Sequence, residues 1–236
     1  MIKTFLILIN LVNILYSSQQ IILVVSNNID SSVAKLECYE DNGGKKIFKT
    51  MDVNIGKNGL AWGLGEINLP QNNSEPLKYE GDKKAPIGVF KLTHIFGYEK
   101  KIKFKMPYLY ANKDLICVDD SNSKFYNKIV QRKGNEKSFE FMKRDDHQYE
   151  LGIVVEHNKQ AQKGRGSCIF LHVKKSENSS TAGCTAMSLD EIKKITNWLD
   201  KDKNPILIQI PLSYSKEILK LYPQIKNSGL LTKIMQ

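Results

Sequence analysis

The stretch IFLHVKKSENSSTAGCTAMSLDEIKKI, residues 169–195, holds the features on which the fold prediction depends. It opens with an apolar run that ends near His172, and it places Cys184 directly after Gly183. The thiolate is the reactive form of cysteine, and a neighbouring imidazole can take the thiol proton. A strand, a loop and a return to a helix start would bring the two side chains together. Cys184 as a nucleophile with His172 as its base is one hypothesis, and two buried packing residues are the other.

A helix is predicted directly after this cysteine, over residues 188–200. Ser188 and Glu191 have the spacing of a capping box. One buried face is predicted by the apolar residues at helical spacing, Leu189, Ile192, Ile195 and Leu199. We expect the helix N-terminus to stabilise a Cys184 thiolate, and backbone N–H groups at Gly183 and Cys184 to bind a developing oxyanion.

Short strand-like segments with turn residues between them dominate the rest of the chain. They are predicted at residues 19–28, 33–40, 47–56, 87–92, 101–110, 115–120, 152–158, 167–173 and 204–211. Residues 57–86 are rich in Gly, Asn and Pro and are predicted to be loop. A second short helix is predicted over residues 215–222. The pattern predicts a mostly β (β-rich α+β) fold, a sandwich or barrel with one helix following the cysteine.

The N-terminal residues 1–18 have the composition of a secretory leader. Lys3 precedes an apolar run over residues 5–16 that is too short to span a bilayer, and small polar residues follow. A buried first element or an uncleaved anchor are the alternatives. We expect export to the periplasm or cell envelope, a catalytic domain over residues 19–212, and a C-terminal helix and tail over residues 213–236.

The net charge of +10 favours a polyanionic partner. Because the lysines are scattered and no nucleic-acid motif accompanies them, we expect no nucleic acid, which leaves peripheral contact with an anionic membrane or an acidic cell-wall polymer. No Cys/His spacing resembles a zinc site, and Asp119 and Asp120 are interpreted as part of an Asx-type turn. We therefore expect no metal. The oligomeric state is left open.

Export would place the cysteines in an oxidising compartment, where pairing is allowed. The chain contains Cys38, Cys117, Cys168 and Cys184. A pair such as Cys117 with Cys168 would leave Cys184 free, although the connectivity cannot be deduced from the sequence. The remaining histidines stand in polar or loop contexts, and surface positions are predicted for His94, His147 and His157.

Residues 169–195 resemble the signature of the L,D-transpeptidase catalytic domain, in which a histidine precedes a loop ending in Ser/Thr-x-Gly-Cys before a helix. The matching positions here are His172, Thr181, Gly183 and Cys184. The stretch EGDKKAPIGVFKL, residues 80–92, is similar to the glycine-rich loop and strand of that family. The resemblance runs from about Ile21 to Pro211 and is typical of an exported bacterial subgroup.

This resemblance implies cysteine acyl transfer on peptidoglycan stem peptides without a cofactor. Cys184 would attack the carbonyl that precedes a terminal D-alanine, and His172 would take the thiol proton and return it to the leaving amine. An acceptor amine would then give a 3–3 cross-link, whereas water would give L,D-carboxypeptidase activity. A non-catalytic wall-binding protein with the same fold is a further alternative.

Two departures from the family pattern bear on the site. The usual His-Gly is His172-Val173, which keeps the backbone carbonyl that would orient the imidazole. The usual arginine two positions after the cysteine is Ala186, and the candidates to replace it are Lys174, Lys175, Arg144 and Arg165. Catalytic roles are predicted for Cys184, His172, Gly183 and Val173. Substrate-binding roles are predicted for Thr181, Lys174, Tyr126, Asn127 and Gly88.

Overall fold

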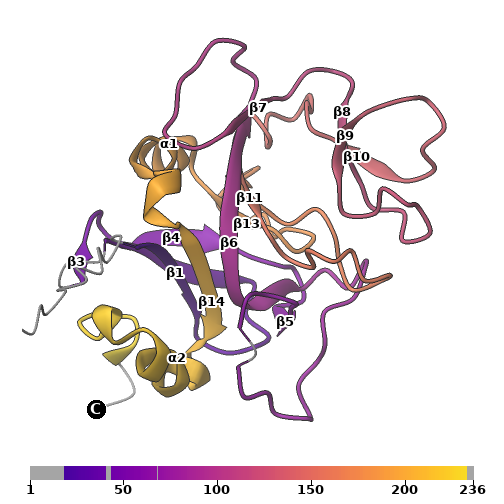
Figure 1. Cartoon of the computed structure of the whole chain (residues 1–236). Coiled ribbons are helices and arrows are strands. Elements are labelled where there is room, and N and C mark those ends of the chain that lie inside the picture. Colours follow the sequence, from indigo (N-terminus) through magenta and orange to yellow (C-terminus); the bar gives the residue numbers. More distant parts are fainter. Residues whose placement is uncertain (1–18, 41–43, 68, 233–236) are drawn as a thin grey trace, which may run out of the picture.

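The computed structural model describes residues 19–40, 44–67 and 69–232 (Figure 1). The predicted leader over residues 1–18 lies outside the described residues. Strands outnumber helices throughout the described ranges, so the prediction of a mostly β fold is confirmed. No helix in these ranges is long and apolar enough to cross a lipid bilayer.

Most strands belong to one large sheet. In chain order they are β1 (Gln20–Ser26), β2 (Val33–Glu40), β3 (Lys45–Lys46), β4 (Met51–Asn54), β5 (Leu60–Trp62), β6 (Ala85–Gly97), β7 (Tyr108–Tyr110), β11 (Leu151–Val155), β12 (Phe170–Val173), β13 (Thr185–Met187) and β14 (Ile206–Pro211). A smaller sheet contains β8 (Leu115–Val118), β9 (Ile129–Gln131) and β10 (Phe139–Phe141). The helices are α1 (Leu189–Trp198) and α2 (Ser215–Leu221), with 3-10 turns at Lys201–Lys203, Leu212–Tyr214 and Pro223–Ile225.

The large sheet closes on itself like a barrel. Its hydrogen-bonded order runs β1-β14-β6-β11-β12-β13-β4-β2, and β2 pairs in turn with β1. The pairs β1–β14 and β12–β13 are parallel. Apolar side chains of these strands form the main core, and Ile218 of α2 and Leu231 near the C-terminus pack into it. The segment from α2 to Leu231 therefore helps to bury the barrel strands.

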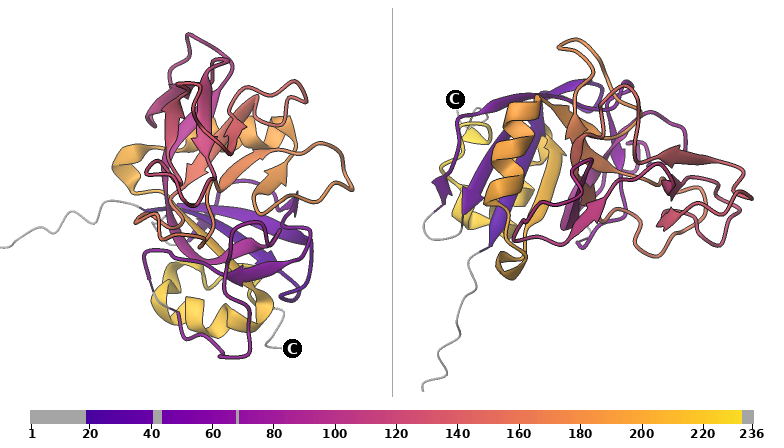
Figure 2. Two further views of the ribbon diagram at one scale, coloured as in Figure 1. Left: turned by 90° about the vertical axis from the view of Figure 1, so that its right-hand side faces the viewer. Right: turned by 90° about the horizontal axis from the view of Figure 1, so that it is seen from above.

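Helix α1 lies across one side of this sheet, against β11 and β12 (Figure 2). The predicted capping box is confirmed: Ser188 Oγ accepts from the Glu191 backbone N–H, and the Glu191 carboxylate accepts from the Ser188 N–H. Ile192 and Ile195 are buried in the main core, as their helical spacing predicts. The capping box and the apolar stripe therefore predict correctly where in the sequence this helix forms and which of its faces is buried.

The opposite face of β12 and β13 is covered by the small sheet β8–β10, which we call the roof. The roof projects away from the barrel in Figure 1 and in the right-hand view of Figure 2. A second apolar cluster lies between roof and sheet, and it contains Phe96, Ala111, Leu115, Cys117, Met142, Tyr149, Cys168, Phe170 and Cys184. A disulfide joins Cys117 in β8 to Cys168 just before β12, so the roof is covalently tied to the sheet that it covers. Cys38 and Cys184 are free thiols, as the hypothesis of a reactive Cys184 requires.

Two segment predictions are wrong. Residues 57–86 are not all loop, because they include β5, which pairs in parallel with the first residues of β6. Three residues are too few to show a strand periodicity, so only the pairing partner reveals this strand. The strand predicted over residues 101–110 is restricted to β7. Pro107 has no N–H to donate to a sheet ladder, and the lysine-rich residues before it are mostly exposed.

Candidate active site

Cys184 and His172 lie on the same face of the sheet, beneath the roof. His172 in β12 pairs with Ala186 in β13, and the Phe170 N–H is directed at the Cys184 sulfur at 3.4 Å. Since side chains alternate along strands, Phe170, His172 and Cys184 project to one side. Tyr149 lies between the two: its ring is 5.2 Å from the imidazole, centre to centre, and its hydroxyl group contributes to lowering the pKa of the Cys184 thiol.

The His172 ring is oriented by the carbonyl of the next residue. Nδ1 lies 2.8 Å from the Val173 carbonyl oxygen. A carbonyl can only accept, so Nδ1 carries the ring proton and Nε2 is left as a proton acceptor. Burial lowers the pKa of His172 to about 4, and the bond to Val173 opposes that shift only partly. The imidazole is therefore neutral at pH 7, which is the form that a general base needs.

The Cys184 thiol is enclosed and protonated in this closed state. Its residue is 8% exposed, and burial raises the pKa of the thiol to about 12. The negative charge of Glu140 raises the pKa further, whereas the Phe170 N–H and the positive charge of Lys78 lower it. Loss of hydration destabilises the thiolate more than these polar groups stabilise it. The thiol and the imidazole on this face of the sheet are therefore both neutral at pH 7.

The prediction that a helix N-terminus stabilises the thiolate is wrong. The chain does not turn directly from Cys184 into α1, because residues 185–187 form β13. This short strand pairs in parallel with β12 and antiparallel with β4, which the sequence between cysteine and helix does not reveal. The buried side chains of α1 belong to the main core on the other side of the sheet. The helix dipole is therefore separated from the sulfur by the sheet.

A tight turn presents the cysteine to the chamber. Thr181 Oγ1 donates to the Cys184 carbonyl at 2.7 Å and accepts from the Gly183 N–H at 3.1 Å. Gly183 has a φ of +144°, and a Cβ there would lie 2.9 Å from the Lys84 carbonyl oxygen. Glycine is therefore required on two grounds, backbone conformation and space. The Gly183 N–H is occupied within the turn, so its predicted contact with an oxyanion would need the turn to rearrange.

Tyr126 and Asn127 make structural contacts near the site. The Tyr126 hydroxyl donates to Glu80 at 2.5 Å and is buried. Asn127 accepts from the Cys168 N–H at 2.9 Å through its side-chain oxygen, and its amide donates to the carbonyls of residues 157 and 158. These contacts hold the segment that carries the disulfide. Their substrate-binding roles stay predictions.

The other substrate-binding candidates are spread more widely. Lys174 is paired with Glu177 at 2.6 Å. Gly88 lines a separate hollow of about 270 Å³ together with Arg165. Thr181 shapes the nucleophile turn, as described above. The substrate-binding roles of Lys174, Gly88 and Thr181 therefore also stay predictions.

Arg144 is the basic candidate that the structure connects to the reactive pair. Its guanidinium lies over the Tyr149 ring at 5.1 Å, and its positive charge contributes to the lowered pKa of His172. Two hydrogen bonds to the Asp146 carboxylate, at 2.9 and 2.6 Å, fix its plane. Arg144 and Glu140 also line a hollow of about 440 Å³ at the edge of the roof. A substrate carboxylate entering from this side would meet a guanidinium that is already oriented.

Sequence reasoning misses several groups at the site. Lys78, Glu140 and Tyr149 come from three distant segments, and their burial beside the cysteine depends on the tertiary fold. Lys78 stands two residues before the glycine-rich stretch, which is the one local signal that could have found it.

The surface prediction for His157 is wrong. His157 is 2% exposed; its Nδ1 accepts from the Leu64 N–H at 3.2 Å, and its Nε2 lies 2.9 Å from the Arg165 carbonyl oxygen. Burial lowers its pKa to about 4. Its polar neighbours in the sequence suggest exposure, but loop carbonyl and N–H groups satisfy the ring inside the protein. His94 is half-buried, and His147 is exposed as predicted.

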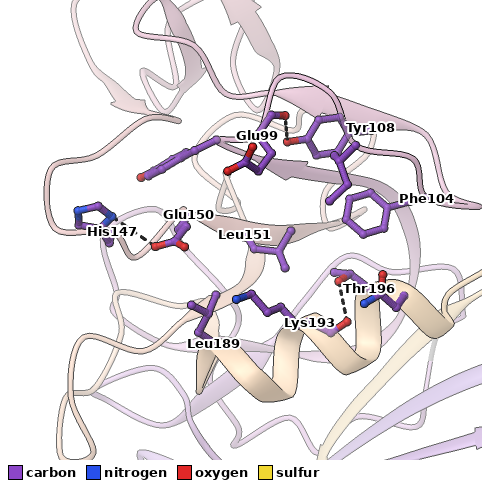
Figure 3. Close-up of a pocket in the computed structure, with 12 residues that line it drawn as sticks. Glu99, Phe104, Tyr108, His147, Glu150, Leu151, Leu189, Lys193 and Thr196 are labelled. Carbon is purple, nitrogen blue, oxygen red and sulfur yellow. Dashed lines mark hydrogen bonds and ion pairs between the residues drawn. The ribbon is translucent and has the colours of Figure 1, made fainter.

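A larger hollow, of about 490 Å³, lies between α1 and the β6–β7 edge (Figure 3). His147, Glu150 and Leu151 line it, but Cys184 and His172 do not. Tyr149, between the lining residues in the sequence, instead belongs to the cluster beneath the roof. The hollow therefore lies apart from the reactive pair.

The acidic residues give no indication of a metal site. The Asp120 carboxylate accepts from the Asn122 N–H at 2.9 Å, which confirms the predicted Asx-type turn. Across the described ranges, no three His, Cys, Asp or Glu side chains converge as a metal site would require.

Comparisons with known proteins agree with the sequence resemblance. The family model for the L,D-transpeptidase catalytic domain, YkuD, matches residues 22–208. Among solved structures the chain is similar to the helical cell shape determining protein Pgp2 from Campylobacter jejuni, with 15% identity and a TM-score of 0.41. That match covers 82% of this chain and 47% of Pgp2, so this chain spans less than half of its relative. No curated protein matches the chain significantly. Because the family model covers most of the sequence, the chain belongs to the L,D-transpeptidase catalytic domain family, YkuD.

Proposed function

We propose that this protein is an exported cysteine acyltransferase of the cell envelope that acts on peptidoglycan stem peptides. The observation that carries the proposal is the pair beneath the roof: Cys184 and His172 share one sheet face, and the Val173 carbonyl leaves Nε2 of the histidine free to accept a proton. Membership of the L,D-transpeptidase family supports peptidoglycan as the substrate. The leader composition of residues 1–18 supports export to the periplasm or cell envelope.

The reaction proceeds in two acyl-transfer steps. His172 Nε2 takes the thiol proton, and the Cys184 sulfur attacks the carbonyl carbon of the peptide bond to the terminal D-alanine. The C–N bond breaks, the D-alanine nitrogen takes the proton from His172, and a thioester remains. An acceptor amine then attacks the thioester and gives a 3–3 cross-link. Water in the same role gives a shortened stem peptide.

The closed chamber has to open for this chemistry. Desolvation, which keeps the thiol protonated and the imidazole neutral, weakens when the roof moves or when a polar substrate enters. The pKa values of the two groups then approach each other, and proton transfer becomes less costly. Enclosure of the free thiol therefore limits its reactivity in the absence of substrate.

Arg144 is our candidate for the substrate carboxylate that the missing arginine at position 186 would otherwise contact. It lies beside Tyr149, which touches His172, whereas Lys174 is engaged with Glu177. An arginine held by Asp146 presents a planar pair of donors. Arg144→Lys should therefore raise the KM for tetrapeptide substrates more than it lowers kcat.

The second candidate function is L,D-carboxypeptidase activity, because an alanine at position 186, where the family usually has an arginine, alters the contacts that select donor and acceptor. Incubation of the mature protein with disaccharide tetrapeptides, followed by mass spectrometry, separates the alternatives. Cross-linked dimers with released D-alanine support the transpeptidase, and shortened stems alone support the carboxypeptidase. Unchanged stems that remain bound would indicate a wall-binding protein and overturn the proposed chemistry. Cys184→Ala is the matched control.

A further inference from the structure

Lys78 is a buried lysine on a segment that passes behind the nucleophile turn. Its side chain is 3% exposed, and its Nζ is paired with Asp82 Oδ1 at 2.5 Å. The same ammonium donates to the Tyr79 carbonyl at 2.9 Å. Its methylene chain packs against Gly166, where a Cβ would lie 3.1 Å from it. Burying an ammonium group is costly, and it is tolerated only when the charge is paired and hydrogen-bonded.

The ammonium lies close to the residue that precedes the nucleophile. Lys78 Nζ is 3.7 Å from the point that a Cβ on Gly183 would occupy. With no side chain at residue 183, no atom of that residue fills the space between the cation and the turn. The positive charge lowers the pKa of the Cys184 thiol and disfavours protonation of His157. Two separate groups thus experience the field of this one buried charge.

The other described groups that act on the sulfur do not supply a compensating cation, and Arg144, which lies over the Tyr149 ring, is paired with Asp146. Glu140 places a negative charge on the roof side, and the Tyr149 hydroxyl is neutral and donates to Glu140 at 2.5 Å. His172 is neutral at pH 7. The N-terminus of α1 is separated from the sulfur by the sheet, and position 186 is an alanine. The positive charge behind Gly183 is therefore the one that offsets Glu140 at the sulfur.

We propose that Lys78 is a positioning residue for the reaction, whose buried charge stabilises the Cys184 thiolate from behind Gly183 when His172 takes the thiol proton. The inference rests on the proposed role of Cys184 as the nucleophile. Lys78 acts through the turn and through its field, and it touches neither the substrate nor the reacting atoms. The charge of Lys78 therefore supplies the stabilisation of the Cys184 thiolate that the sequence predicts from the N-terminus of α1.

Asp82 holds the lysine in place. Its carboxylate accepts from the backbone N–H groups of Tyr79 and Lys84, both at 2.8 Å, so it is fixed by main-chain contacts. The carbonyl of Lys84 in turn lies against Gly183. Because the two charges are opposite, the lysine should favour the thiolate and the aspartate should oppose it. A purely structural role would make the loss of either residue affect the protein alike, whereas this electrostatic role predicts opposite shifts.

The test is the pH dependence of iodoacetamide alkylation at Cys184, followed by peptide mapping with mass spectrometry. Cys38, which is fully buried with a strongly raised pKa, serves as the unreactive internal reference. Lys78→Met should move the midpoint of the alkylation profile upward by about 1 pH unit. Asp82→Asn should leave the midpoint unchanged or lower it. Lys78→Arg should keep the wild-type midpoint, and Glu140→Gln should lower it.

The double variant Lys78→Met/Asp82→Asn removes both charges and guards against a folding failure of Lys78→Met alone. It should show an upward shift smaller than that of Lys78→Met, because the opposing carboxylate is also gone. An unchanged midpoint in folded Lys78→Met, or upward shifts of equal size in Lys78→Met and Asp82→Asn, would overturn the inference. Alkylation needs no peptidoglycan, so this result is independent of whether the wild-type protein turns over muropeptides.

Discussion

The two faces of β12 and β13 have different chemistry. On one face, Leu171 and Met187 contribute to the main core, which also contains Ile195 of α1. On the other face, Cys184 and His172 lie beneath a roof that brings in tyrosine, glutamate and a disulfide. The first face uses close packing, whereas the second encloses polar groups whose pKa values are far from their usual range. Because side chains alternate along each strand, the same short strand contributes residues to the packed face and to the reactive face.

This difference indicates that stability and reactivity are separable here. Changes on the α1 face should alter the free energy of unfolding but leave the sulfur chemistry intact. Changes on the roof face should alter the chemistry first.

The largest effect is expected for His172→Ala. Loss of the general base should lower D-alanine release from tetrapeptide muropeptides by about 10²- to 10⁴-fold, because His172 is the proposed acceptor of the thiol proton. Circular dichroism should show a folded protein. His147→Ala is the matched control, because His147 is exposed and should leave the rate within a few-fold. A folded His172→Ala variant with nearly normal release would remove the base from the mechanism.

Ile195→Ala should affect the other face alone. Truncating this fully buried side chain should lower the free energy of unfolding by about 2–5 kcal/mol, measured by urea titration. The pH midpoint of Cys184 alkylation should stay at its wild-type value. Lys194→Ala, on the exposed side of the same helix, should change neither quantity. A shifted alkylation midpoint in Ile195→Ala would show that the two faces are coupled.

The disulfide should contribute to both properties. Replacing Cys117 and Cys168 with serine opens a covalent loop whose ends are 51 residues apart, and should cost about 2–4 kcal/mol of unfolding free energy. The roof would then be held only by non-covalent contacts, so alkylation of Cys184 should become faster at every pH. Equal alkylation rates with and without the disulfide would mean that the roof opens without any restraint from this bond.

His157 should make the protein less stable in mild acid. Its pKa is about 4 in the folded protein and close to 6.5 in the unfolded chain, so the unfolded chain binds a proton first as the pH falls. The stability contributed by the neutral ring is present above pH 6.5 and is lost as the pH falls toward 4. Between pH 7 and pH 5 the wild type should lose roughly 2 kcal/mol more than His157→Asn. Parallel urea titrations at the two pH values measure this difference, and equal losses would contradict the assigned shift.

The elements that sequence reasoning predicts well are those set by neighbours in the chain. Helix α1 follows from a capping box and an apolar stripe, and β12 follows from its apolar run. The strand, loop and helix order predicts that Cys184 and His172 come together, and the structure places both on one face of the sheet. The Val173 carbonyl contact, which the family resemblance implies, is present.

The remaining features depend on pairing between distant segments. Three residues after Cys184 form β13 only because β12 and β4 flank them, and this moves the helix away from the sulfur. His157 has polar neighbours in the sequence, yet its ring is buried by loop groups from residues 64 and 165. Lys78, Glu140 and Tyr149 surround the cysteine from three different segments. No local sequence pattern predicts such a cluster, because its members are close in space but not regularly spaced in the sequence.

Nucleophilic catalysis by Cys184 is tested most directly by D-alanine release from the Cys184→Ala variant. This variant should stay folded, because the substitution removes one sulfur atom, and it should release no D-alanine from tetrapeptide muropeptides and form no thioester. The wild-type protein under the same conditions should release D-alanine and carry an acyl adduct on the Cys184 peptide. Near-normal release by the folded Cys184→Ala variant would rule out Cys184 as the nucleophile and leave the pair beneath the roof with a packing role only.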